Sequence, residues 1–251
     1  MVLIGLGSGG CKVVKKFNNS HKKIIIDAER LPSLKKLLKF KEKECFFFVC
    51  GAGKIASASL RLLETIKDKK INIVYIYPEE ILLSPQQKRA NKVIFNVLQE
   101  YTRCGLMNSM WLFSNEMIAE AIPSITMDNM WDKINEAIVN SIENVLYHRS
   151  ETPFIGSHHE QREISRIMSI EYGDLKSDEK KIYFPLDNIT ESCYINIVGK
   201  KEMKENKNLL NTLKQRVIND QENKTTSSFT VFKSEYDQSF YYAIHFTHFL
   251  Q

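Results

Sequence analysis

The segment MVLIGLGSGGCKVV, residues 1–14, joins a short apolar run to a cluster of glycines. An apolar run that ends in glycines before an apolar-periodic stretch is typical of a strand, a tight turn and a helix. Gly5, Gly7 and Gly10 have the GxGxxG spacing of a dinucleotide-binding turn. Glycines let the backbone approach a phosphate, and the start of the following helix offers unpaired N–H groups. The segment predicts a phosphate-binding turn, and a tight turn without a ligand is the alternative.

A second small-residue turn, GAGKIASAS at 51–59, follows the apolar run CFFFVC at 45–50. It contains Gly-Lys but lacks the GxxxxGK[ST] spacing, so a Walker loop is excluded. Two such turns on adjacent strands could hold one polyphosphate between two helix N-termini. This convergence is the central prediction from the sequence.

Apolar runs and helical periodicities alternate along the first 150 residues. Strands are predicted at 1–6, 23–27, 45–50, 71–77 and 109–113, and helices at 11–17, 55–66, 86–101 and 128–147. The last helix carries an apolar stripe of Ile134, Ile138, Ile142 and Val145, and both Trp111 and Trp131 are expected in the core. Such alternation predicts an α/β fold with a doubly wound, mostly parallel sheet.

The pattern changes after residue 150. A helix is predicted at 158–168, a strand at 192–198, a helix at 204–220, and strands at 229–233 and 240–249. The expected domains are therefore 1–150 and a smaller α+β domain with a mixed sheet at 151–251.

Composition excludes several classes of protein. With 251 residues, 43% hydrophobic and 26% charged, the chain can bury a core and is not globally disordered. The net charge is only +5, but residues 12–43 hold eleven Lys or Arg against three Asp or Glu, a local +8. A solvated basic face explains this run, and a docking face for nucleic acid is the alternative.

The five cysteines include no CxxC pair, which favours a reducing compartment and argues against a disulfide framework or structural zinc. There is no signal-like start and no apolar stretch long enough for a membrane helix. The expected location is the cytoplasm, without a membrane partner.

The order of these segments resembles that of the tubulin/FtsZ superfamily over most of the chain. GLGSGGCKVV resembles the family's first phosphate loop, IIIDAE its strand ending in NTDAQ, and FFFVCGAGKIASAS its strand with the glycine signature. MWLFSNEMI resembles the IPND segment, DKINEAIVNSIENVL the central helix, and CYINIVGKKEM the VNITGG segment. SSFTVF and YYAIHFTHF match the last elements in order.

This resemblance implies binding of GTP or GDP, with Mg²⁺ as an open question, and head-to-tail polymerisation with copies of the same chain. Glu160 and Glu163 fall at the two acidic positions that complete the neighbouring subunit's GTPase site, with His158 in place of the family's Asn. His159 and Glu163 also have the i, i+4 spacing of a metal pair, without a visible third ligand. The implied nucleotide-binding residues are Gly7, Ser8, Gly9, Gly10, Cys11, Lys12, Gly51, Gly53, Lys54, Ser57, Arg89, Asn115 and Asp132.

Several positions depart from the family pattern. Lys12 replaces the base-contacting Asn, Asp128 stands where an aromatic residue stacks on the base, and Ile55 interrupts the signature turn. Only eighteen residues separate Asp27 from Phe46, so the γ-phosphate loop is expected to be missing. GTP hydrolysis stays open, and a structural or partner-binding protein that needs no nucleotide is the alternative function. The Lys-, Asn- and Ile-rich composition suggests a phage or plasmid source.

Overall fold

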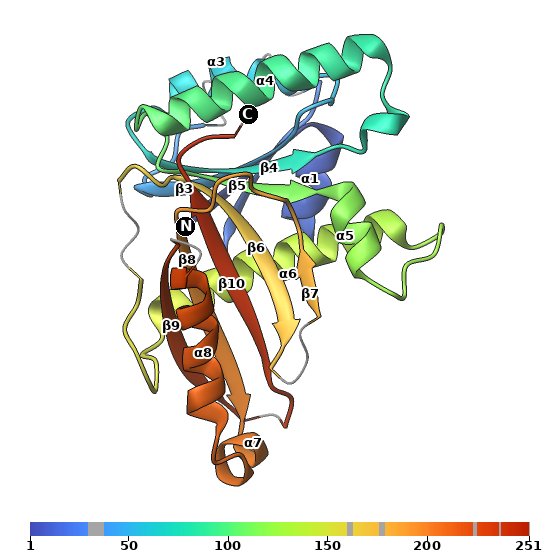
Figure 1. Ribbon diagram of the computed structural model, residues 1–251. Coiled ribbons are helices and arrows are strands. Elements are labelled where there is room, and N and C mark those ends of the chain that lie inside the picture. Colours follow the sequence, from blue (N-terminus) through green and yellow to red (C-terminus); the bar gives the residue numbers. More distant parts are fainter. Residues whose placement is uncertain (30–37, 160–162, 176–178, 223–224, 236, 251) are drawn as a thin grey trace. The chain divides into compact units, whose positions relative to one another are not determined.

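The two glycine turns follow neighbouring strands of one parallel sheet (Figure 1). The computed structural model describes residues 1–251 except 30–37, 160–162, 176–178, 223–224, 236 and 251. The chain divides into two compact units, unit 1 at Met1–Asn140 and unit 2 at Ser141–Gln251. Among the described residues, no helix combines the length and apolarity needed to cross a membrane.

Unit 1 contains a five-stranded parallel sheet of order β2-β1-β3-β4-β5. Its strands are β1 (Val2–Leu6), β2 (Lys22–Ile26), β3 (Glu44–Cys50), β4 (Lys70–Tyr77) and β5 (Ser109–Ser114). All five strands predicted for this part of the chain are confirmed. β1, β3, β4 and β5 are almost continuously apolar because helices cover both faces of the sheet.

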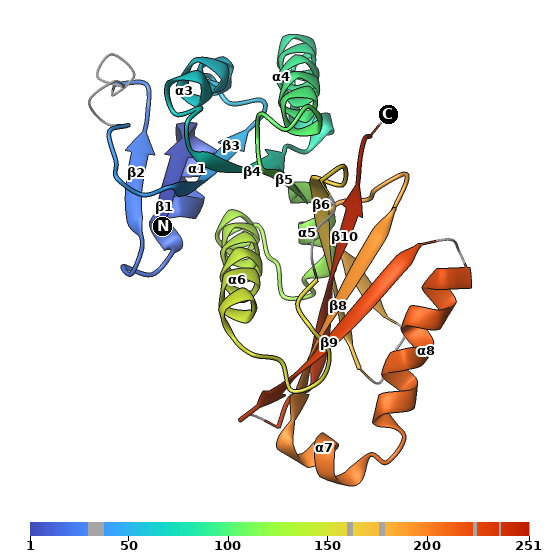
Figure 2. The ribbon, with the colours of Figure 1, turned by 90° about the vertical axis from the view of Figure 1, so that its left-hand side faces the viewer.

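The unit 1 helices lie on both faces of the sheet, with α3 and α4 over one face and α1 on the other (Figures 1 and 2). They are α1 (Gly7–Lys16), α3 (Ser59–Thr65), α4 (Pro85–Arg103), α5 (Asn115–Ala121) and the first half of α6 (Met130–Ser150), with short 3₁₀ turns η2 (Ala56–Ala58) and η3 (Glu80–Leu82). The predicted stripe on α6, Ile134, Ile138, Ile142 and Val145, is buried. The predicted doubly wound architecture is therefore confirmed.

The strand order reverses between β1 and β3. From β1 the chain passes through α1 to β2 on one side, whereas β3, β4 and β5 extend to the other. In doubly wound sheets, ligands bind in the crevice at the carboxyl ends of the strands at such a switch point. Both glycine turns lie at this edge of the sheet.

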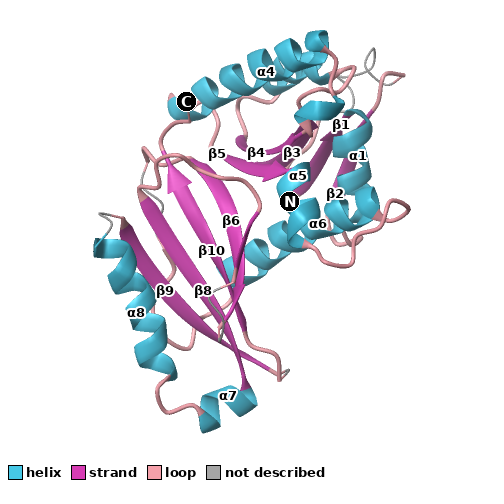
Figure 3. Ribbon diagram, turned by 45° about the vertical axis from the view of Figure 1, so that its right-hand side comes forward, coloured by secondary structure: helices cyan, strands magenta, loops and turns pink. Residues whose placement is uncertain are grey.

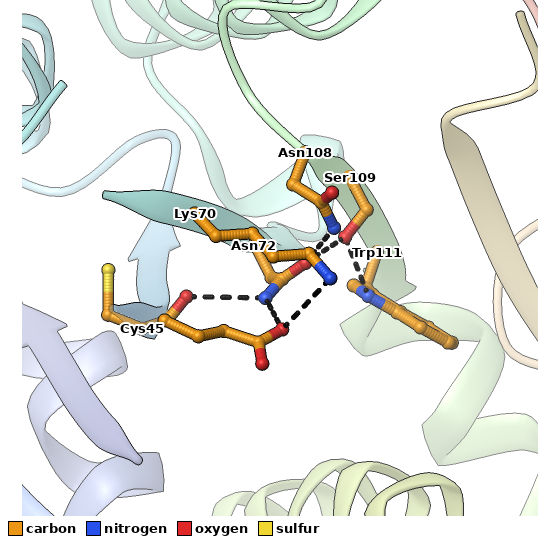
Figure 4. Close-up of polar contacts among 7 residues, drawn as sticks. Cys45, Lys70, Asn72, Asn108, Ser109 and Trp111 are labelled. Carbon is orange, nitrogen blue, oxygen red and sulfur yellow. Dashed lines mark hydrogen bonds and ion pairs between the residues drawn. The ribbon is translucent and has the colours of Figure 1, made fainter. Parts of the chain in front are cut away.

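A buried polar network joins β3, β4 and β5 near their amino ends (Figure 4). Asn72, only 1% exposed, donates from Nδ2 to Glu44 Oε1 at 2.8 Å and to the Cys45 carbonyl oxygen at 3.4 Å. Its Oδ1 accepts from Asn108 Nδ2 at 2.6 Å and Ser109 Oγ at 2.7 Å. One amide thus satisfies polar groups on three strands, at the end of the sheet away from the glycine turns.

Replacing Asn72 by alanine is expected to destabilise unit 1 by about 2 kcal/mol, because Ser109 and Asn108 lose a buried acceptor. Chemical denaturation followed by circular dichroism measures the free energy of unfolding. Asn140→Ala, which removes an exposed asparagine side chain, is the matched control and should change it little. Equal effects of the two variants would contradict a structural role for the network.

Unit 2 contains a mixed sheet in which β7, β6, β10 and β8 are antiparallel neighbours and β9 runs parallel to β8. Its strands are β6 (Ile167–Asp174), β7 (Lys180–Ile182), β8 (Glu191–Gly199), β9 (Thr226–Ser234) and β10 (Phe240–Thr247). The parallel pair requires a crossover connection, which α7 (Lys200–Glu205) and α8 (Leu209–Glu222) supply. Figure 3 shows α8 along one face of this sheet, where Leu213 packs on Tyr194, Val231 and Tyr241.

Unit 2 corrects two element predictions. The helix expected at 158–168 is wrong for the described residues, because Ile167 and Met168 begin β6 and no described residue of 158–166 is helical. The single helix expected at 204–220 is two helices, α7 and α8. The predicted mixed α+β architecture itself is confirmed.

A charged cluster is buried on the α8 face of unit 2. Glu171, only 3% exposed, accepts a hydrogen bond from the Tyr241 hydroxyl at 2.9 Å and lies 3.5 Å from His245 Nε2 and 3.7 Å from Lys180 Nζ. Burial opposes ionisation, but the hydrogen bond and charge of His245, with Lys180 and Tyr241, hold the pKa of the Glu171 carboxyl below its ordinary 4.5. Glu171 is therefore ionised in the folded protein at neutral pH.

The acid stability of unit 2 should depend on Glu171. A carboxyl whose pKa is lowered by folding stabilises the folded state above its ordinary pKa, and this contribution is lost as pH falls through the folded value. The free energy of unfolding should therefore fall below pH 4.5, and more steeply in the parent chain than in Glu171→Gln. Urea titrations between pH 3 and pH 7, on the order of one unit apart, measure the two slopes. Identical slopes would contradict this account.

Candidate functional site

A cavity of 850 Å³ lies in unit 1 at the carboxyl edge of the sheet. It is lined by the first glycine turn, the ends of β2, β3 and β4, the start of α5 and the first turns of α6. The two glycine turns meet at this cavity, because a Cβ added at Gly9 would lie 3.0 Å from Cys50 Cβ and one at Gly7 would lie 3.4 Å from Ile55 Cγ1. The volume lies in the usual range for a small-molecule site.

The first glycine turn contains glycines of two kinds. Gly7 has φ of 70°, a left-handed conformation that favours glycine, and it lines the cavity with Ser8 and Gly9. Gly5 and Gly10 instead let α1 approach the sheet, because a Cβ at Gly5 would lie 2.7 Å from the Gly10 carbonyl oxygen and one at Gly10 would overlap the Phe48 carbonyl oxygen. The spacing thus combines a turn that lines the cavity with close packing of a helix on a strand.

The start of α1 is suited to an anion. No side chain caps this helix start, and its first turn contains no acidic residue. The first N–H groups of a helix, together with the positive end of its dipole, form an anion site when they face a cavity. Lys12 and Lys15 of the same helix line the cavity, and Cys11, which also lines it, donates through Sγ to the Gly5 carbonyl oxygen at 3.2 Å.

Residues of β4 and α4 pack against the second turn on the side away from the cavity. Gly51 packs against the Tyr75 hydroxyl, which donates to Asn91 Oδ1 at 2.8 Å. Burial raises the pKa of Tyr75 far above its ordinary value, so the phenol remains a donor. Gly53, Lys54 and the carbon chain of Ile55 face the cavity.

Two asparagines from different helices line the cavity. Asn115, at the first position of α5, is only 8% exposed, and Asn135 is half-buried on α6. Within the part of the chain that the structure describes, neither amide has a hydrogen-bond partner. Buried amides are normally paired, so these two are available to a ligand.

Trp131 is the aromatic residue of the cavity. It is 44% exposed, so the expectation that it lies in the core is wrong, whereas Trp111 is buried as expected. Trp131 and Asn135 are four residues apart on α6 and therefore share one helix face. Asp132, one residue round the helix, is turned away from the cavity and pairs with Lys16 of α1 at 2.7 Å.

The structure brings most of the sequence-predicted nucleotide-binding residues to the cavity. Those that line it are Gly7, Ser8, Gly9, Cys11, Lys12, Gly53, Lys54 and Asn115. Gly10 and Gly51 support the two turns from behind. Ser57, Arg89 and Asp132 are exposed and lie outside the lining, as does Asp128.

Sequence reasoning missed Trp131 and Asn135, together with Lys15 and Gln87. A Trp-x-x-x-Asn spacing at the start of the long helix was the available signal. Gln87 lies in the first turn of α4, where a capping box formed by Ser84 and Gln87 sets the helix start at the cavity edge.

The charges of the lining are mixed. Lys12, Lys15 and Lys54 form no ion pair within the described residues, and the acids of the lining are Asp27 and Glu79. No group of three or more His, Cys, Asp or Glu side chains that could hold a metal alone occurs among the described residues. Mg²⁺ in nucleotide sites usually needs one or two carboxylates plus phosphate oxygens, so Asp27 and Glu79 fit this ion only beside a bound polyphosphate.

The predicted catalytic segment lies in unit 2. Glu160 lies outside the described residues, and Glu163 is exposed beside Ile164, which is 67% exposed. The preceding histidines are held in place: His158 Nε2 lies 2.7 Å from the Glu151 carbonyl oxygen, and His159 Nε2 lies 3.1 Å from the buried Glu191 carboxylate.

Solved structures of low sequence identity share the whole fold. FtsZ of M. jannaschii, in an empty dimer, has a TM-score of 0.66 at 10% identity, over 98% of this chain and 87% of that chain. TubZ of Bacillus thuringiensis serovar israelensis, in a GTPγS-form protofilament, has a TM-score of 0.74 at 12% identity, over 99% and 86%. The chain has a tubulin/FtsZ-like fold. CetZ of Methanosaeta thermophila shares this fold as well, with a TM-score of 0.71 at 8% identity over 99% of this chain and 86% of that chain. Neither a protein-family model nor a curated protein matches the sequence.

Proposed function

We propose that this chain binds a guanine nucleotide in the unit 1 cavity and assembles head to tail with copies of itself into filaments. One observation carries the proposal: an aromatic side chain, two unpaired amides and an uncapped helix start face the same 850 Å³ cavity. These are the groups that a purine base and a polyphosphate require. Their placement at a topological switch point agrees with ligand binding in other doubly wound sheets.

The base end of the ligand is assigned to α5 and α6. Trp131 stacks on the purine ring, and Asn115 and Asn135 pair with its edge, since an amide offers both a donor and an acceptor. The phosphates lie at the start of α1, with Lys12 and Lys54 as counter-charges. Asp27 and Glu79 would hold Mg²⁺, which supplies charge neutralisation when it is bound.

Self-assembly is supported by two kinds of evidence. Structures of similar fold include a TubZ protofilament and a four-stranded TubZ filament. In this chain Leu82 lines the cavity and is 62% exposed, and its neighbour in the sequence, Ile81, is 81% exposed. Exposed apolar side chains beside a pocket are typical of a surface that another protein covers.

Fluorescence of Trp131 tests binding directly, since the other tryptophan, Trp111, is buried. Titration with GTP or GDP should quench the emission, and ATP should do so more weakly. Sedimentation and electron microscopy of the same samples should show filaments that depend on guanine nucleotide. Absence of any guanine nucleotide binding at about 1 mM, a very weak affinity, would refute the proposed function.

Hydrolysis is assigned to the acidic segment of the neighbouring subunit, in which Glu163 and Glu160 would orient water. Glu163→Gln is expected to lower GTP turnover by about 100-fold while leaving nucleotide affinity unchanged. Phosphate release assays measure the effect. Glu179→Gln, another exposed glutamate of unit 2, is the matched control.

Mixing variants tests whether the acid acts on another subunit. A Trp131→Ala subunit lacks the stacking residue but keeps Glu163, so it should restore turnover in the pocket of a Glu163→Gln subunit. Turnover that stays low in the mixture would show that Glu163 does not act across the interface.

A nucleotide-independent structural role is the second candidate. It is favoured by the second turn, where an isoleucine side chain rather than a glycine faces the cavity. Under this alternative, assembly is unchanged by nucleotide and by Gly9→Asp, which places a negative charge in the phosphate turn. Strict dependence of assembly on GTP or GDP would exclude it.

A further inference from the structure

The two turns of the cavity differ in the backbone donors they offer. At the start of α1 no side chain caps the helix. In the second turn the Gly53 N–H donates to the Cys50 carbonyl oxygen at 3.1 Å and the Ala56 N–H to the Gly53 carbonyl oxygen at 2.9 Å. The Ala58 N–H donates to the Ile55 carbonyl oxygen at 3.0 Å. The N–H groups of Gly53, Ala56 and Ala58 are therefore already paired within the second turn, whereas no side chain occupies the N–H groups at the start of α1.

The side chains of the second turn reinforce this difference. Ile55 lines the cavity and faces the start of α1, at 3.4 Å from where a Gly7 Cβ would stand. The Ile55 side chain would displace water from a phosphate oxygen without donating a hydrogen bond in its place. Such desolvation is unfavourable. Lys54 is the cation that the second turn contributes to the lining.

The base end of the cavity sets the direction of the ligand. With the purine at Trp131 and Asn135, the phosphates extend toward the start of α1 and its N–H groups. A further phosphate would continue toward the second turn, where the side chain of Ile55 presents methyl groups to it. Lys54 offers that phosphate one charge, in the form of a flexible ammonium rather than a fixed cradle.

We infer that the cavity is a nucleoside diphosphate site that does not distinguish diphosphate from triphosphate. The inference rests on the proposed function and deepens it by naming the ligand class. Since a ligand shifts an equilibrium only through differential affinity, a site without such discrimination does not switch on the γ-phosphate. GDP therefore supports assembly as well as GTP does.

Calorimetry on the full chain with GMP, GDP and GTP tests the inference. GDP and GTP should bind with dissociation constants within about threefold of each other, a difference below 1 kcal/mol, and GMP should bind much more weakly. GTP binding more than about tenfold tighter than GDP would overturn the inference but leave the proposed function intact. Binding of neither nucleotide refutes the proposed function itself.

A substitution at the second turn provides an independent test. Ile55→Thr replaces a methyl-bearing branch by a hydroxyl, so GTP should gain about fivefold over GDP, the effect of one added hydrogen bond. Ile25→Thr is the matched control, because Ile25 also lines the cavity but lies at the end of β2. A GTP preference that is equal in both variants would overturn the role of Ile55. The comparison of nucleotides in the parent chain remains decisive if either variant fails to fold.

Discussion

Gly10→Ala is expected to unfold unit 1 or to destabilise it by about 3 kcal/mol or more. A Cβ at this position would overlap the carbonyl oxygen of Phe48, which lies in the buried middle of β3. The strand β3 cannot move easily, because it is hydrogen-bonded on one side to β1 and on the other to β4. Relief requires α1 to move away from the sheet, which exposes the buried side chains of Val13 and Val14.

Denaturant titration and thermal melting measure this effect. Ser8→Ala, an exposed position in the same turn, is the matched control and should change the free energy of unfolding by less than about 0.5 kcal/mol. A Gly10→Ala protein of parental stability would show that α1 does not pack against β3 as described.

Trp131→Ala is expected to weaken GDP and GTP binding by about 10- to 100-fold. Stacking of a base on an aromatic side chain contributes about 1–3 kcal/mol. The stability of unit 1 should change little, because the indole is exposed at 44%. Trp131→Phe should recover part of the affinity, because a smaller aromatic ring still stacks.

Calorimetry is the appropriate measurement, since the variant lacks its own fluorescent probe. Met127→Ala removes a side chain that is 95% exposed and lies outside the cavity lining, and it serves as the control. Unchanged affinity in Trp131→Ala would show that the purine does not bind on the α6 side of the cavity. A nucleotide with its phosphates at the start of α1 would then place its base elsewhere in the cavity.

The unit 1 fold was predictable because its signals are local. Parallel strands buried on both faces read as continuous apolar runs, and glycines mark the positions where α1 crosses the sheet closely. β6 in unit 2 lacked this signal. Its alternate positions Ser169 and Glu171 are buried polar residues that find partners far along the chain, at the Phe184 carbonyl oxygen and at His245 and Tyr241. The sequence shows the polarity of these residues but not the partners that permit their burial.

The candidate site was predictable on its phosphate side and only partly on its base side. Both glycine turns follow strands, so the strand order alone brings them together. The base side depends on the rotation of α6, where a step of one residue exchanges Trp131 and Asn135 for Asp132. The Lys16–Asp132 ion pair and the buried isoleucine stripe fix that rotation, and both are tertiary contacts.

The cysteines of the chain, all within its described part, differ sharply in accessibility. Cys11, Cys45 and Cys193 are buried and Cys50 is half-buried, whereas Cys104 is exposed just after α4. Burial raises the pKa of Cys45 to about 12 and that of Cys193 to about 11, so these thiols stay protonated and unreactive near neutral pH. Burial also raises the pKa of the half-buried Cys50, so a maleimide dye should attach first at Cys104 without any engineered mutation. Light microscopy could then follow single labelled subunits as they join and leave a growing polymer.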